Sequence, residues 1–234
     1  GEGPALMTEY QAYGVRHFLR LLDAEGASEL RRRVIPRLDG TETEKGAWSD
    51  TDELVMDPAQ QGVLTYRTLV LRRNPRQSRP PSPYERVWQG RYYEVWQRDP
   101  DYQASRLIVH HPLGGGFQPA VVPNCAVVQS VAAEAGQSGK VVAAIREPNA
   151  VANLTVYPPD WVPDPPNKTL TPLSDGTATG QVVIPESGEY RVWVGGSARG
   201  KVSVEIGGQD AGSALGILNN NAQFISLDDL DFEA

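Results

Sequence analysis

The stretch 181–229 constrains the fold more than any other part of the chain. Apolar and polar residues alternate along 189–194 and again along 201–206, which is the period of a strand with one buried face. Gly207-Gly208 offers a tight turn between two such strands, because glycine adopts positive φ at little cost. The alternation predicts six inward-facing positions: Tyr190, Val192, Val194, Val202, Val204 and Ile206. Several short antiparallel strands at this spacing are typical of a β-sandwich.

The two parts of the chain differ in composition. Its 234 residues suffice for one large or two small domains, and its 19 prolines and 23 glycines favour strands and ordered loops. Residues 1–150 hold 18 acidic and 18 basic side chains, whereas residues 151–234 hold 11 acidic and 4 basic ones. The acidic second part argues against nucleic acid as a partner. We therefore expect an α/β domain over 1–150 and a β-sandwich domain over 151–234.

Strands and helices alternate in the first 150 residues. The pattern predicts strands at 4–9, Val63–Leu71 and Val141–Ile145, helices at Tyr10–Leu22, Ala27–Ile35 and Asn124–Ala135, the last ended by Gly139, and a hairpin at Tyr84–Gln97. A three-residue turn at Gln89–Arg91 would oppose Arg86 to Glu94 and Trp88 to Tyr92. We expect it in place of a two-residue turn, which would set Glu85 against Glu94.

No catalytic motif is present, and we expect neither catalysis by this chain nor a cofactor. Asp228, Asp229 and Asp231 cluster, but on one strand they do not form the facing carboxylate pair of a glycosidase. We expect these three carboxylates to lie in solvent at an edge of the fold, and a calcium site is the less favoured alternative. His110 and His111 point to opposite faces if extended, which disfavours a shared metal. Cys125 is the single cysteine, so an intrachain disulfide is excluded, and we expect it to be buried.

Aromatic side chains are the best candidates for binding a ligand. Sugars lay their C–H faces on aromatic rings, and Trp193 falls on the face of its strand opposite the expected core. The candidate carbohydrate-binding residues are Arg191, Trp193, Asn219, Asn220 and Gln223. The alternative is that Trp193 packs inside the protein or against another domain.

The stretch from Ser78-Arg-Pro-Pro to Gly90-Arg-Tyr-Tyr-Glu-Val-Trp-Gln-Arg resembles soluble regions of actinobacterial multi-pass membrane proteins of the glycosyltransferase-like, GT-C-like kind. The run from Ile184 to Ser197 is similar to the jelly-roll domains appended to them, which look like carbohydrate-binding modules. The resemblance implies an extracytoplasmic location near cell-envelope glycans. It also implies a membrane-embedded portion of the same polypeptide, which agrees with termini that read as cut.

These observations lead to three hypotheses. The first is a non-catalytic extracytoplasmic region of a membrane glycosyltransferase-like protein that binds or positions cell-envelope glycan. The second is a structural or protein-interaction module without a ligand. The third, a glycan-active enzyme, requires two convergent carboxylates in a cleft.

Overall fold

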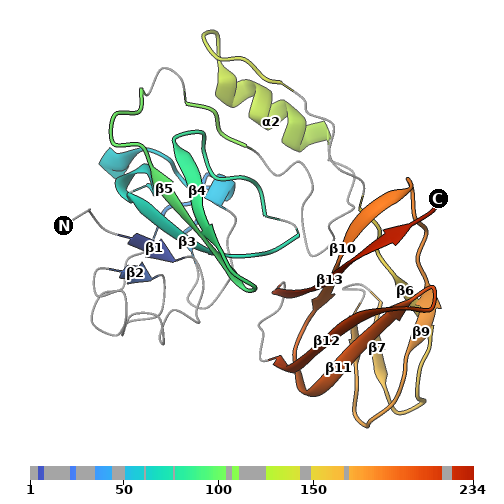
Figure 1. Ribbon diagram of the computed structural model, residues 1–234. Helices are drawn as coiled ribbons and strands as arrows, with labels where there is room; N and C mark the ends of the chain where they lie inside the picture. Colours follow the sequence, from blue (N-terminus) through green and yellow to red (C-terminus); the bar gives the residue numbers. More distant parts are fainter. Residues whose placement is uncertain are drawn as a thin grey trace. The chain divides into compact units, whose positions relative to one another are not determined.

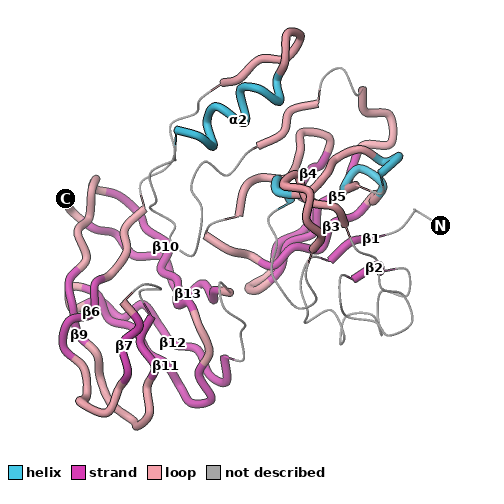
Figure 2. Tube along the Cα trace, turned by 180° about the vertical axis from the view of Figure 1, so that it is seen from behind, coloured by secondary structure: helices cyan, strands magenta, loops and turns pink. Residues whose placement is uncertain are grey.

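The protein is β-rich, with several separate sheets and little helix (Figures 1 and 2). The computed structural model describes residues 5–7, 22–24, 35–43, 51–60, 62–75, 77–103, 107–110, 125–142, 149–165, 169–217 and 223–234. The chain divides into two compact units. The first combines Gly1–Pro112 with Arg191–Asp229, and the second combines Leu113–Tyr190 with Leu230–Ala234. The expected boundary at residue 150 does not coincide with this division, because residues 191–229 group with the N-terminal part of the chain.

A five-stranded mixed sheet forms the centre of the N-terminal part of the first unit. Its strand order is β2 (Leu22–Ala24), β1 (Ala5–Met7), β3 (Thr68–Arg72), β5 (Tyr93–Arg98) and β4 (Tyr84–Gln89). The pairs β1–β2 and β1–β3 are parallel, whereas β3–β5 and β4–β5 are antiparallel. Parallel neighbours require a crossover connection. The expected helices at Tyr10–Leu22 and Ala27–Ile35 fall almost wholly outside the described residues, and Leu22 itself begins β2.

The core of this sheet lies mainly on one of its faces. It consists of Leu6, Ile35, Leu54, Val63, Leu64, Tyr66, Leu69, Leu71 and Tyr84. Met7 and Val70 form a smaller cluster, against which Ala5, Tyr93 and Val95 pack. Neither cluster includes a residue of 191–229, so the C-terminal strands do not share this core.

The expected strand at Val63–Leu71 is wrong in its first half. Val63–Thr65 forms a short 3₁₀ helix, η3, and β3 begins only at Thr68. Two further 3₁₀ turns, η1 (Thr51–Glu53) and η2 (Pro58–Gln60), precede η3. Val63 and Leu64 are buried all the same. A short apolar run shows that a segment is buried, but its periodicity does not separate a strand from a helical turn.

The hairpin at Tyr84–Gln97 is confirmed, but its turn and its register are not those expected. The amide of Gly90 donates to the carbonyl of Tyr93 (2.8 Å), so the turn residues are Arg91 and Tyr92. Trp88 pairs with Val95 and Arg86 with Trp96, with a β-bulge at the intervening Val87. The position of the turn keeps Glu85 away from Glu94, and the bulge shifts the remaining register by one residue so that Glu85 lies opposite Gln97.

Four long strands form the C-terminal part of the fold. Strand β10 (Gly188–Gly195) pairs with β13 (Phe224–Phe232), and β11 (Ala198–Ile206) pairs antiparallel with β12 (Gln209–Ile217). The Gly207-Gly208 turn is confirmed, with φ of 60° and 81°. Along β11, Val202, Val204 and Ile206 are half-buried and the residues between them are exposed, as the alternation predicts.

The described part of the second unit contains helix α2 and four short strands. Helix α2 spans Cys125–Ala135, β6 (Asn153–Val156) pairs with β9 (Thr179–Gln181), and β7 (Val162–Asp164) pairs with β8 (Thr169–Thr171). The helix is followed by Gly136 at φ 58°, three residues before the expected stop at Gly139. Val141 and Val142 are exposed and form no strand. None of the described helices has the length and apolar character needed to cross a membrane.

Candidate functional site

The expected aromatic platform on β10 is partly occupied by the protein's own side chains. Trp193 is half-buried, and the Arg73 guanidinium carbon lies 5.4 Å from the centre of its ring. Arg191, on the same face of the strand, makes a bidentate ion pair with Asp229, with both N–O distances 2.7 Å. Arg73 therefore covers the Trp193 ring. This arrangement agrees with the alternative in which Trp193 packs inside the protein.

Arg73 is held in this position by several acceptors. Its Nη1 donates to the carbonyl oxygens of Gly90 (3.2 Å) and Arg91 (3.3 Å) and lies 3.4 Å from the hydroxyl of Ser226. Burial lowers the pKa of Arg73, and the nearby Arg191 adds to this effect. A buried guanidinium with these partners stabilises the packing of the first unit.

The other residues of the expected carbohydrate site do not extend the platform. Gln223 is fully buried at 0% exposure, so its amide is not presented to a ligand. Asn219 and Asn220 lie outside the described residues. Of the five candidates, the structure brings together Arg191 and Trp193 on one face of β10.

Among the described residues, the candidate metal ligands and the candidate nucleophile do not come together in a site. Asp228, Asp229 and Asp231 are exposed, and the described residues contain no group of three or more metal-binding side chains. Burial lowers the pKa of half-buried His110, whose Nδ1 has no hydrogen-bond partner among the described residues; His111 lies outside them.

Cys125 is exposed, which corrects the expectation of a buried thiol. Val128, in the next turn of α2, is also exposed.

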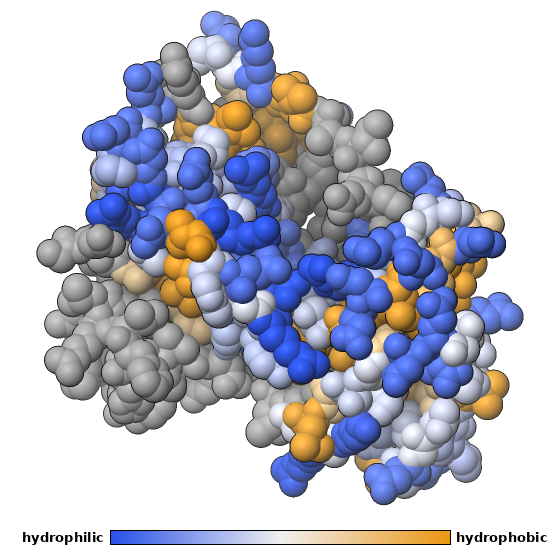
Figure 3. Space-filling model, viewed as in Figure 1, coloured by the Kyte–Doolittle hydropathy of each residue, from blue (hydrophilic) through white to orange (hydrophobic). Residues whose placement is uncertain are grey.

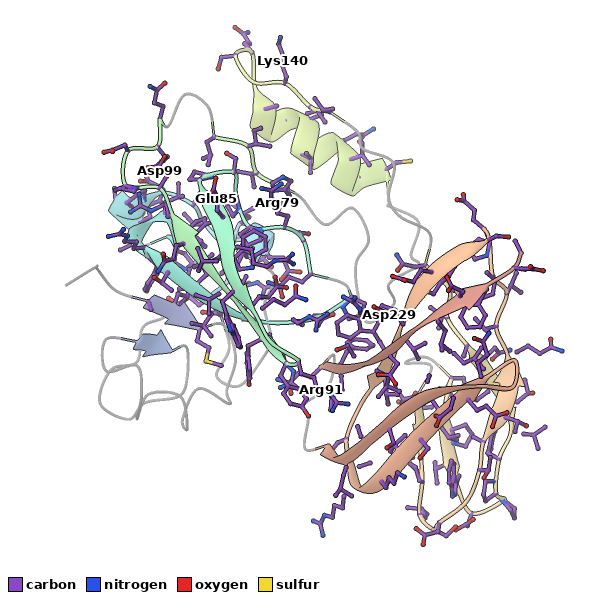
Figure 4. The ribbon with its side chains drawn as sticks, in the orientation of Figure 1. Arg79, Glu85, Arg91, Asp99, Lys140 and Asp229 are labelled. Carbon is purple, nitrogen blue, oxygen red and sulfur yellow. The ribbon has the colours of Figure 1, made fainter. Side chains whose placement is uncertain are left out.

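A small open cavity lies at the end of the β4–β5 hairpin away from its turn. Its volume is about 190 Å³, and it is lined by Ser82, Pro83, Glu85, Asp99, Tyr102 and Gln103. Figure 4 shows Glu85 and Asp99 near this end of the hairpin and Arg91 at the other end. The sequence alone did not reveal this cavity, because its walls come from two segments more than ten residues apart.

Backbone hydrogen bonds hold the two walls of the cavity together. The amide of Asp99 donates to the carbonyl of Pro83 (2.9 Å), which joins the segment before β4 to the segment after β5. Ser82 Oγ accepts the amide of Ile108 (3.0 Å), and Asp99 Oδ1 accepts the amide of Asp101 (2.8 Å). Two of the polar lining groups are thus oriented by the backbone before any ligand arrives.

Aromatic packing fixes the remaining wall. Tyr102 packs against the main core, and the Arg98 guanidinium lies 4.9 Å from the centre of its ring. Glu85 and Asp99 are both exposed, and they supply acceptors to the cavity. The Ser82 hydroxyl and the Gln103 amide add groups that can donate as well as accept. This lining suits a small, uncharged ligand rich in hydroxyl groups, because two carboxylates repel an anion.

The Arg191–Asp229 pair predicts a small loss of stability in acid. The hydrogen bond from Arg191 is the main cause that lowers the pKa of Asp229 below its ordinary 3.8, and the charges of Arg191 and Arg73 act in the same direction. The stabilisation is therefore complete above pH 3.8 and is lost as the pH falls through the lower, folded-state pKa. We expect Arg191→Lys, which loses the bidentate geometry, to reduce the free energy of unfolding by about 0.5 kcal/mol at pH 7. The difference between the two proteins in urea unfolding should shrink as the pH falls below 3.8; a difference that does not shrink in acid would show that the ion pair is not its source.

In comparisons with known proteins, no protein-family model, curated protein or solved structure matches the chain.

Proposed function

We propose that this chain is a non-catalytic glycan-binding region, located outside the cytoplasm and belonging to a membrane glycosyltransferase-like protein. The resemblance of 78–98 and 184–197 to such proteins motivates the location, the envelope glycan as ligand and the membrane-embedded part as partner. The β-rich C-terminal strands agree with the jelly-roll that this proposal includes, and an α/β organisation of the N-terminal part remains part of the same proposal.

The cavity at the base of the β4–β5 hairpin carries the proposal. It combines the carboxylates of Glu85 and Asp99 with a hydroxyl, an amide and the ring of Tyr102. Sugar hydroxyls donate to carboxylates and exchange hydrogen bonds with hydroxyls and amides, while a ring accepts the C–H face. A volume of about 190 Å³ suits one sugar ring. We therefore assign glycan recognition to this cavity in preference to the partly covered Trp193.

Glycan hydrolysis is the second candidate function, because Glu85 and Asp99 line the same cavity. A glycosidase uses two carboxyl groups flanking the bond that it breaks. Its general acid is usually placed in apolar surroundings that keep it protonated. Glu85 and Asp99 are both exposed instead, and Asp99 accepts a backbone amide. These surroundings favour hydrogen-bonding acceptors over an acid–base pair, so binding is the preferred function.

Titration with defined glycans tests the proposal. Isothermal titration calorimetry with arabinan, galactan and mannan fragments should show binding of at least one of them. Glu85→Gln and Asp99→Asn should each weaken it about tenfold, because a hydrogen bond to a charged group is lost. Glu205→Gln, at an exposed site on β11, is the matched control and should bind as the parent does. The absence of binding to all three fragments, or equal affinities of the four proteins, would overturn the proposal.

The same samples separate binding from hydrolysis. Labelled glycan incubated with the parent protein should be recovered intact. Release of shorter products that stops in both Glu85→Gln and Asp99→Asn would establish the enzymatic alternative instead.

A further inference from the structure

The β-bulge at Val87 aligns two side chains that an ordinary strand would separate. Residues three positions apart on a regular strand point to opposite faces of the sheet. In β4, however, Glu85 pairs with Gln97 and Trp88 pairs with Val95, and direct partners share a face. Because Gln97 and Val95 are two positions apart on β5, they lie on the same face, and so do Glu85 and Trp88. Bulges commonly redirect a side chain in this way beside functional sites.

Trp88 is exposed and yet is held in one place. Trp88 is 54% exposed on an edge strand, whereas Tyr84 in the same sheet is buried and Tyr93 and Trp96 are half-buried. The six-membered part of its indole lies against Gly90: a Cβ at Gly90 would collide with Cη2 and lie 2.8 Å from Cζ2. A larger residue at position 90 would displace the ring from this position. One part of the indole is thus anchored on the turn while more than half of its surface faces solvent.

The cavity and the indole together form a strip along β4. Two sheet positions separate Glu85 from Trp88, which corresponds to about 7 Å along the strand. The indole extends from there toward Gly90 and the turn, so one extended chain of several units can reach both the cavity and the ring. Figure 3 shows apolar residues interspersed with hydrophilic ones on one face of the molecule.

We propose that the β4 strip binds an extended, uncharged oligosaccharide, with one unit in the cavity beside Glu85 and a following unit stacked on Trp88. This inference rests on the proposed function and specifies its ligand as a chain of at least two units. The cavity supplies hydrogen-bond acceptors, and the indole supplies a preformed apolar surface at low cost in side-chain entropy. The bulge is what allows one ligand to reach both.

Affinity as a function of ligand length tests the strip. In calorimetry with the monosaccharide, disaccharide and tetrasaccharide of whichever fragment binds, Trp88→Ala should weaken tetrasaccharide binding about tenfold and leave monosaccharide binding unchanged. Gly90→Ala, which retains the indole but displaces it, should have the same selective effect. Gln89→Ala is the control, because Gln89 pairs with Glu94 on the opposite face of the same strand.

The outcomes separate this inference from the function on which it rests. If Trp88→Ala and Gly90→Ala bind the tetrasaccharide as tightly as the parent while Glu85→Gln does not, the strip is wrong and the cavity stands. If no saccharide binds at all, both fail. A loss of self-association in Trp88→Ala, measured by sedimentation without any change in saccharide affinity, would overturn the strip in favour of a protein partner.

Discussion

Tyr84→Ala is expected to lower the free energy of unfolding by about 3–5 kcal/mol, the usual cost of removing a large buried ring. Tyr84 is fully buried in the main core, and it is the first residue of β4. Its hydroxyl lies 2.8 Å from the carbonyl oxygen of Val63 and 2.6 Å from that of Tyr66. The ring therefore connects the edge strand to the chain segment that precedes β3.

Tyr84→Phe separates the ring from the hydroxyl. The carbonyl of Val63 also accepts the amide of Tyr66 (3.0 Å), and the carbonyl of Tyr66 also accepts Arg98 Nε (3.4 Å). Neither acceptor is left without a donor, so we expect a loss of only about 1 kcal/mol. Urea unfolding followed by circular dichroism measures both variants. A loss in Tyr84→Phe as large as in Tyr84→Ala would show that the hydroxyl, and not the packing, dominates.

The parent protein and Tyr84→Phe should differ in their response to alkali. Burial raises the pKa of Tyr84 well above its ordinary value of 10.0. The unfolded chain then loses this proton near pH 10 while the folded protein keeps it, so stability is complete below pH 10 and falls as the pH rises above it. Tyr84→Phe should lack this contribution and show a shallower decline between pH 10 and 11.

Gly62→Ala is expected to cost about 3 kcal/mol for steric reasons. The backbone of Gly62 has φ −70° and ψ −177°, which any residue adopts, so conformational strain is not the reason for glycine. An added Cβ would instead collide with the carbonyl oxygen of Val55 and lie 2.8 Å from that of Asp57. The amides of Gly62 and Val63 donate to the same two carbonyls, so moving them apart also breaks the bonds that join these segments.

Gly40→Ala is the matched control for Gly62→Ala. Gly40 has φ 82° and no atom within 4 Å of an added Cβ, so it has room but an unfavourable backbone conformation. We expect a loss of about 1 kcal/mol there. Thermal and urea unfolding of the two variants should rank Gly62→Ala as clearly the less stable. The reverse order would mean that the segment around Val55 yields easily and that its packing is loose.

The residues proposed to bind glycan and the residues that stabilise the β4–β5 hairpin are different ones. Tyr84 anchors the start of β4 in the core, and Asp99 follows β5 with its amide bonded to Pro83. The exposed Glu85 and Trp88 lie between these anchors and the turn. Variants at Glu85 and Trp88 should therefore change affinity without lowering stability, which makes the hairpin suitable for measuring recognition by itself.

Local pattern alone was sufficient for much of the secondary structure. The alternation along β11, the Gly207-Gly208 turn and helix α2 follow from period, from the freedom of glycine at positive φ and from helical spacing. These features depend on neighbours within a few residues. For that reason the local sequence was enough to predict them.

The candidate site depended on contacts that the sequence does not display. The bulge at Val87, which puts Glu85 and Trp88 on one face, changes the register without any marker in the local alternation. The cavity needs the segments around Pro83 and Asp99 to meet, and Arg73 covers Trp193 from a part of the chain 120 residues away. Periodicity shows which side of a strand is apolar, whereas packing decides what covers that side, and only the assembled sheets determine it.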